Sequence, residues 1–180
     1  MSRRATILLA LAAVAVIAAS AASASSNRSS ATTVARIDHV ADGDTVALTN
    51  GRRVRLVQID TPEVYFGTEC YGPQASAMTK RLLPPGTLVR LFVEPKTDRV
   101  DQYGRLLRYV VRVRDGLNVN VRLVAVGAAA PYFYLGRRGR FAAQLDFLAR
   151  RARSDHLGLW RACPGTPYQP NASLNTGPSR

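Results

Sequence analysis

The chain has 180 residues, which is enough for one domain with extensions, and its 47% hydrophobic content excludes a wholly disordered protein. Twenty-five Lys and Arg residues against 12 Asp and Glu residues give a formal net charge of +13. Such a surface attracts polyanions, and we expect nucleic acid as the first candidate partner and an anionic membrane as the second. A GC-rich genome, which favours arginine and alanine codons, is the alternative explanation of the charge.

The N-terminus has the pattern of a secretory signal peptide. Two arginines precede an apolar stretch from Ala5 to Ala19, and the small residues that end at Ala24 offer A-x-A cleavage sites. We therefore expect residues 1–24 to be removed on export by the general or the twin-arginine route, and residues 25–31 to be a flexible leader. The mature chain would then be secreted or held in the cell envelope. A retained membrane anchor is the alternative for the apolar stretch.

Strand signals dominate from residue 32 to about residue 114. Asn50-Gly51 is a strong hairpin signal between two of these strands. The expected strands cover residues 34–40, 45–48, 52–59, 88–93 and 106–113.

Helix signals interrupt and follow the strands. The expected helices cover residues 72–82, 120–126 and 139–155, the last with an apolar stripe at spacings of four, three and four. Five short strands joined largely by turns favour a small closed barrel over a βαβ sheet. We place this domain at residues 32–163 and expect the Pro-, Gly- and polar-rich residues 164–180 to be a disordered tail.

The chain has two cysteines, Cys70 and Cys163. In an exported chain, a single disulfide between them is the expected state. Two cysteines and two histidines scattered along the sequence lack the spacing of a zinc site.

Three short clusters carry residues that could do chemistry: Asp42 to Thr45, Arg55 to Glu63, and Asp101 to Arg105. Each alone is typical of a turn or a strand end. Together they bring carboxylates and arginines to the ends of neighbouring expected strands. Clustered carboxylates select hard cations such as Ca²⁺ or Mg²⁺, and arginine binds phosphate through two donors. A cation, a carboxylate base and guanidinium groups are the parts needed to hydrolyse a phosphodiester.

The order and spacing of several motifs resemble the staphylococcal nuclease (thermonuclease) family over about residues 33–160. The motifs are D-G-D-T at 42–45, V-R-L-V-Q-I-D-T-P-E at 54–63, Y-G-P-Q-A-S at 71–76, D-Q-Y-G-R at 101–105, N-V-R-L-V-A-V-G at 120–127 and G-L-W at 158–160.

The resemblance implies an α+β protein, an OB-fold five-stranded β-barrel with about three helices. It implies a Ca²⁺-dependent nuclease that acts on DNA and possibly RNA without strong sequence selectivity. We further expect a monomer with no stable membrane partner once the signal peptide is removed. The expected calcium ligands are the Asp44 and Asp60 side chains and the Thr61 backbone carbonyl.

The same resemblance implies the catalytic residues. Glu63 matches the position assigned as general base, and Arg55 and Arg105 match the positions that hold the phosphate and stabilise its developing charge. Because these side chains are all present, we do not expect this chain to be one of the catalytically degenerate relatives, which serve as binding modules. A non-catalytic OB-fold module of the cell envelope that binds nucleic acid is nevertheless the alternative to be tested.

Three tyrosines are candidates for substrate contact. Tyr103, Tyr132 and Tyr134 are similarly placed to family tyrosines that stack on bases or touch the terminal phosphate. The alternative is that residues 131–134 form an aromatic loop that packs on the barrel. The loop between Glu63 and Tyr71 is shorter than in the best-known family member, which leaves substrate preference open.

Overall fold

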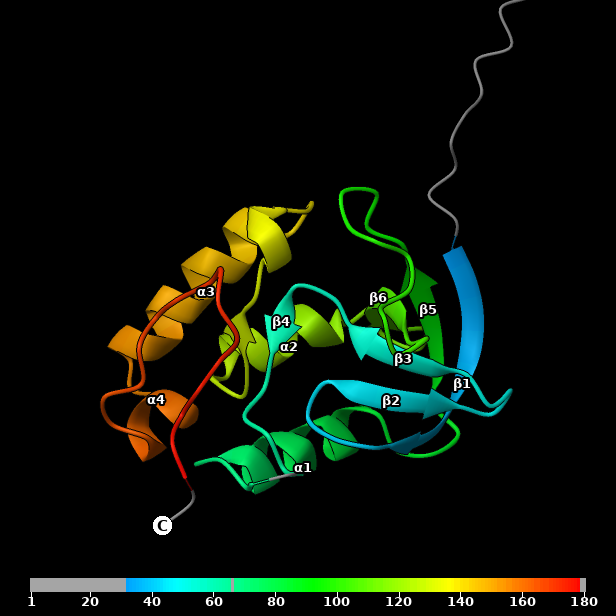
Figure 1. The fold of residues 1–180 in the computed structure, drawn as a ribbon. Helices are drawn as coiled ribbons and strands as arrows, with labels where there is room; N and C mark the ends of the chain where they lie inside the picture. Colours follow the sequence, from blue (N-terminus) through cyan, green and yellow to red (C-terminus); the bar gives the residue numbers. More distant parts are fainter. Residues whose placement is uncertain (1–31, 66, 179–180) are drawn as a thin grey trace, which may run out of the picture.

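The structure is a computed structural model that describes residues 32–65 and 67–178 (Figure 1). The expected signal peptide and leader, residues 1–31, lie outside the described residues. No helix within the described ranges is long and apolar enough to cross a membrane.

Five strands close into a barrel, as expected from the sequence, and the structure gives their order as β1-β2-β3-β6-β5. β3 and β6 pair in parallel, and the other neighbouring strands pair antiparallel. Hydrophobic residues at alternate positions of the strands, such as Val54 and Leu56, fill the interior. The strands are β1 (Thr32–Val40), β2 (Thr45–Leu48), β3 (Arg53–Leu56), β5 (Leu88–Phe92) and β6 (Leu106–Arg112).

The helices lie beside and beneath the barrel (Figure 1). The N-terminus of α2 is capped by Asn118, whose side chain accepts a hydrogen bond from Val121 N at 3.2 Å. The longest helix begins three residues later than its periodicity predicts, and the short last helix had no clear signal in the sequence. The helices are α1 (Gly72–Leu82), α2 (Val119–Ala125), α3 (Ala142–Ser154) and α4 (Leu159–Ala162).

The strand expected over residues 52–59 is divided in two. After β3 the chain turns at Gln58, which has a φ of 64°, and continues as β4 (Ile59–Asp60), paired with β7 (Ala130–Pro131). The buried Gln58 side chain accepts hydrogen bonds from Tyr109 Oη and Gly139 N, both at 3.0 Å. These bonds offset the free-energy cost of the left-handed backbone at Gln58. The turn places Asp60 on β4, which pairs with β7 and is not a strand of the barrel.

The C-terminal segment, residues 164–178, differs from the expected disordered tail. It runs as an irregular segment between α3 and β4 (red in Figure 1). Tyr168 Oη donates to Asp146 on α3 at 2.5 Å, and Phe133 N donates to the Pro170 carbonyl at 2.6 Å. These partners are remote in sequence, so the local composition of the segment does not predict its order.

The expected disulfide is present. Cys70 and Cys163 are joined, with their Cα atoms 5.9 Å apart. The bond links the chain just before α1 to the chain just after α4 and fixes the point where the C-terminal segment begins.

Candidate active site

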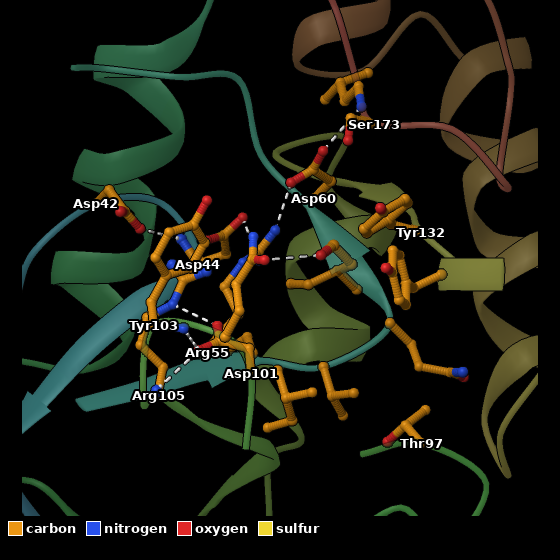
Figure 2. Close-up of a pocket in the computed structure, with 18 of the residues that line it drawn as sticks. Asp42, Asp44, Arg55, Asp60, Thr97, Asp101, Tyr103, Arg105, Tyr132 and Ser173 are labelled. Atoms are coloured by element: carbon orange, nitrogen blue, oxygen red, sulfur yellow. Dashed lines mark hydrogen bonds and ion pairs between the residues drawn. The ribbon is translucent and has the colours of Figure 1, made fainter. Parts of the chain in front are cut away.

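One open groove of about 1000 Å³ lies beside β3 and β4 (Figure 2). Its walls come from the turn before β2, from β3 and β4, from the loop between β5 and β6, and from the chain after β7. Most of the residues singled out from the sequence line this groove, namely Asp44, Arg55, Asp60, Glu63, Tyr103, Arg105, Tyr132 and Tyr134. The structure therefore brings together side chains that are up to ninety residues apart in the sequence.

Asp44 is held at the entry to β2 by a tight turn. The Asp42 carboxylate accepts hydrogen bonds from Asp44 N at 3.0 Å and from Thr45 N at 2.6 Å. On the other side, Asp44 Oδ2 accepts from both Thr61 N at 3.0 Å and Thr61 Oγ1 at 3.1 Å. A Cβ atom at Gly43 would overlap the Thr61 side chain, so glycine is required for this close approach.

Arg55 joins the two carboxylates that the sequence suggested as metal ligands. Its Nη1 lies 2.5 Å from Asp44 Oδ2, and its Nη2 lies 2.5 Å from Asp60 Oδ1 (Figure 2). Burial raises the pKa of Asp44 to about 7, against the attraction of Arg55, and repulsion from Asp60 and Asp42 adds to the rise. Burial lowers the pKa of Arg55, but attraction to the three carboxylates outweighs it, and the net shift is upward.

Asp44 and Asp60 fit a hard divalent cation. Their carboxylates already converge on one cationic group, the Arg55 guanidinium. In the part of the chain that the structure describes, no group of three or more His, Cys, Asp and Glu side chains could hold a metal ion. A cation there would therefore take its remaining ligands from backbone carbonyls, water or substrate, all oxygen donors that suit Ca²⁺ or Mg²⁺.

Arg105 is aimed into the groove by Asp101. Asp101 Oδ2 accepts from Arg105 Nε at 2.7 Å, and Oδ1 accepts from Tyr103 N and Arg105 N, both at 2.9 Å. Arg105 Nη1 also donates to Thr45 Oγ1 at 3.2 Å, next to Asp44. Sequence reasoning treated Asp101 as part of a motif and missed its role in orienting Arg105; the Asp-x-x-x-Arg spacing in a tight turn is the signal that could have found it.

Glu63 lies on an exposed loop at the groove wall. Its carboxylate has no hydrogen bond or ion pair within the described ranges. Burial raises the pKa of Glu63, and repulsion from Asp42 and Asp60 adds to the rise. Its backbone is fixed by Glu69, whose carboxylate accepts from Glu63 N at 3.0 Å and whose N–H donates to the Glu63 carbonyl at 2.9 Å. No motif in the sequence pointed to this reciprocal contact.

The three tyrosines lie along the groove. Tyr103 is 65% exposed and Tyr134 57% exposed, and the rings of Tyr132 and Tyr134 lie 6.3 Å apart. Phe133, between the last two, is fully buried and packs on the core. The residues 131–134 therefore both pack on the barrel, through Phe133, and present aromatic rings to the groove.

Comparison with known proteins gives the family. The family model described as "Staphylococcal nuclease homologue" matches residues 53–162. The chain belongs to the staphylococcal nuclease family. Its closed five-stranded barrel with flanking helices is the OB-fold of that family.

Relatives in this family carry nuclease names. The chain is 35% identical over 130 residues to Endonuclease YncB of Bacillus subtilis (strain 168), covering 69% of this chain and 60% of the relative. It is 36% identical over 130 residues to SPbeta prophage-derived endonuclease YokF of the same organism, covering 69% of this chain and 43% of the relative. Against Thermonuclease of Staphylococcus intermedius the identity is 32% over 130 residues, covering 69% of this chain and 74% of the relative. The chain thus spans less than two thirds of the two Bacillus relatives.

The staphylococcal nuclease match contains Arg55, Asp60, Glu63 and Arg105, but it begins after Asp44 and ends before the C-terminal segment. The groove also takes residues from outside the matched region, with Asp42 and Asp44 before it and Ser173 and Leu174 after it.

Proposed function

We propose that this protein is an exported, Ca²⁺-dependent nuclease that hydrolyses phosphodiester bonds of DNA and RNA with little sequence selectivity. The observation that carries the proposal is the convergence of two carboxylates, two arginines and Glu63 in one open groove. Relatives named as endonucleases and a thermonuclease support nuclease chemistry at this groove. The predicted signal peptide supports export.

The proposed roles follow from the chemistry of each side chain. Arg55 and Arg105 bind the non-bridging oxygens of the scissile phosphate, and their guanidinium groups stabilise the negative charge that develops in the transition state. Glu63 accepts a proton from the attacking water, a role that suits a groove carboxylate with no ion pair to any described residue. Its raised pKa makes it a stronger base than an ordinary glutamate.

Asp44 and Asp60 would hold the cation, with the backbone carbonyl of Thr61 as a further oxygen ligand. Bound Ca²⁺ would supply positive charge to the phosphate oxygens. Asp44 is kept in place by the Thr61 N–H and hydroxyl, so its carboxylate needs little rearrangement to serve as a ligand.

Weak selectivity follows from the proposed substrate contacts. The exposed rings of Tyr103 and Tyr134 can stack on any base, because every base has a π-face. The formal charge of +13, or +11 after loss of the two arginines in residues 1–24, attracts the phosphate backbone regardless of sequence.

The proposal is tested by cleavage assays on the chain without residues 1–24. Supercoiled plasmid, single-stranded DNA and RNA are incubated with CaCl₂ or with EGTA, using wild type, Glu63→Gln and the control Asp155→Asn. Asp155 is a carboxylate at the C-terminal end of α3, paired with Arg151, and it does not line the groove. We expect wild type and the control to cut all three substrates in CaCl₂ but not in EGTA. In CaCl₂, Glu63→Gln should be at least about 100-fold slower than wild type.

Two results would overturn parts of the proposal. DNA that is shifted on a gel but never cut, with or without CaCl₂, would favour the non-catalytic binding module. Cleavage that persists in EGTA would exclude a need for Ca²⁺.

A further inference from the structure

The C-terminal segment, residues 164–178, forms part of the groove. Ser173 and Leu174 line it together with the residues described above, and Figure 2 shows Ser173 beside Asp60. This segment lies beyond the matched family region, which ends at residue 162. It is thus a feature of this chain that the family match does not describe.

One backbone group of the segment contacts a candidate cation ligand directly. Leu174 N donates to Asp60 Oδ2 at 2.8 Å, while Asp60 Oδ1 accepts from Arg55 Nη2 at 2.5 Å. Each oxygen of the Asp60 carboxylate is therefore held by a different donor, and the rotation of the side chain is fixed. Asp60 itself is buried, so these donors replace water contacts that it would otherwise have made.

The segment is attached to the body on both sides of Leu174. Before it, Tyr168 Oη bonds to Asp146, and the Pro170 carbonyl accepts from Phe133 N. The ring of Tyr168 also packs near Trp160, with centroids 6.2 Å apart. These contacts position the chain that enters the groove.

After Leu174 the segment runs beside the loop that carries Glu63. Thr176 Oγ1 donates to the Cys70 carbonyl at 2.7 Å, and Cys70 N donates to the Gly177 carbonyl at 2.8 Å. Pro178 forms a β-bridge with Glu69. Because Cys70 is also joined to Cys163, the segment is tied to this loop both at its start and near its end.

We propose that residues 164–178 are a positioning element of the active site, in which the Leu174 N–H orients the Asp60 carboxylate for binding the divalent cation. This inference rests on the proposed function. A donor fixed by a disulfide and by several long-range hydrogen bonds holds the ligand oxygen ready, and loss of such outer partners lowers metal affinity by about 10- to 100-fold in other sites. The role belongs to the backbone of Leu174 and not to its side chain.

The test compares two substitutions at the same position. Leu174→Pro removes the N–H, whereas Leu174→Ala keeps it and is the matched control. The Ca²⁺ dissociation constant is measured by titrating the protein with CaCl₂ in a calorimeter, and the melting temperature without CaCl₂ is measured alongside. We expect Leu174→Pro to bind Ca²⁺ at least about 10-fold more weakly than wild type and Leu174→Ala to bind within about twofold of it.

If wild type cleaves DNA but Leu174→Pro and Leu174→Ala bind Ca²⁺ with equal affinity, this inference alone would be overturned. A wild type that binds CaCl₂, responds to Leu174→Pro as expected and yet cleaves nothing would overturn the proposed function alone. Should Leu174→Pro fail to fold, a chain ended after Ala172, with its disulfide intact, takes its place. Unchanged Ca²⁺ affinity in that shortened chain would likewise overturn the inference.

Discussion

The Arg55 guanidinium lies 2.5 Å from the Asp44 carboxylate, and both side chains are almost fully enclosed, with exposed fractions of 14% and 8%. The same guanidinium holds Asp60. Arg55 is therefore both the candidate phosphate ligand and the counter-ion of the two carboxylates proposed to bind the cation. Any change at Arg55 should affect folding stability as well as catalysis.

We predict that Arg55→Met destabilises the protein by about 3–5 kcal/mol in EGTA, because it leaves two enclosed carboxylates without their counter-ion. CaCl₂ should raise the melting temperature of this variant more than that of wild type, since the cation would replace the lost positive charge. Thermal unfolding with and without CaCl₂ measures both effects. Arg53→Met is the control, on the same strand and with no ion pair among the described residues. Equal shifts with CaCl₂ in wild type and Arg55→Met would contradict the prediction.

Arg105→Lys should reduce the cleavage rate by about 100-fold or more, since an ammonium group cannot reproduce the two-pronged contact of a guanidinium with phosphate. The fold should remain intact, because lysine keeps the positive charge near Asp101. Steady-state kinetics and circular dichroism are compared with Arg151→Lys, an exposed arginine on α3. A rate close to wild type would remove Arg105 from the catalytic residues.

Asp101→Asn should change how stability depends on pH. Burial raises the pKa of Asp101, but hydrogen bonds from Arg105 and Tyr103 outweigh it, and the net shift is below the ordinary value of 3.8. A lowered pKa in the folded state stabilises the protein above the ordinary value, and this contribution is lost as the pH falls through the lowered value. The difference in unfolding free energy between wild type and Asp101→Asn should therefore be full at pH 6 and shrink below about pH 4. Urea unfolding across this range checks it; a constant difference would contradict it.

Replacing both cysteines should destabilise the protein by up to about 4.5 kcal/mol in the chain-entropy description, because the bond closes a long loop. The two cysteines are 93 residues apart. Urea unfolding of Cys70→Ser/Cys163→Ser is compared with wild type, with and without a reducing agent. The reduced wild type should unfold at the midpoint of the double variant, and identical midpoints in all samples would show that the disulfide contributes nothing.

Cleavage should weaken as salt rises. With a net charge of +13 over the whole chain, binding to nucleic acid releases counterions from the phosphate backbone. We expect the KM for single-stranded DNA to rise at least about 10-fold between 50 and 200 mM NaCl, with a smaller change in kcat. A KM that does not change with salt would show that the arginine-rich surface takes no part in substrate binding.

The sequence predicted the strands with clear turn signals, such as Thr45–Leu48 after D-G-D, and the helix that begins at Gly72-Pro73. Local pattern failed where distant contacts decide the conformation. The break at Gln58 depends on hydrogen bonds from Tyr109 and Gly139, which lie 51 and 81 residues further on. No window of neighbouring residues contains that information.

The candidate site shows the same division. The motifs supplied the residues that line the groove, because the chemistry of phosphate and cation binding needs those residue types. Asp101, which holds Arg105, lies four residues away, and its spacing could have been read from the sequence. Leu174, which holds Asp60, lies 114 residues away, and no local pattern shows that contact. The order of residues 164–178 was missed for this reason.

The closure of the barrel has a practical consequence for anyone who would shorten this chain. β1 pairs with both β2 and β5, and these pairings close the ring on the side opposite the parallel β3–β6 pair. A fragment cut to the family match, residues 53–162, would expose the backbone edges of β3 and β5, the template on which chains aggregate. Expression of that fragment should yield inclusion bodies, whereas a chain that begins before Thr32 should stay in solution.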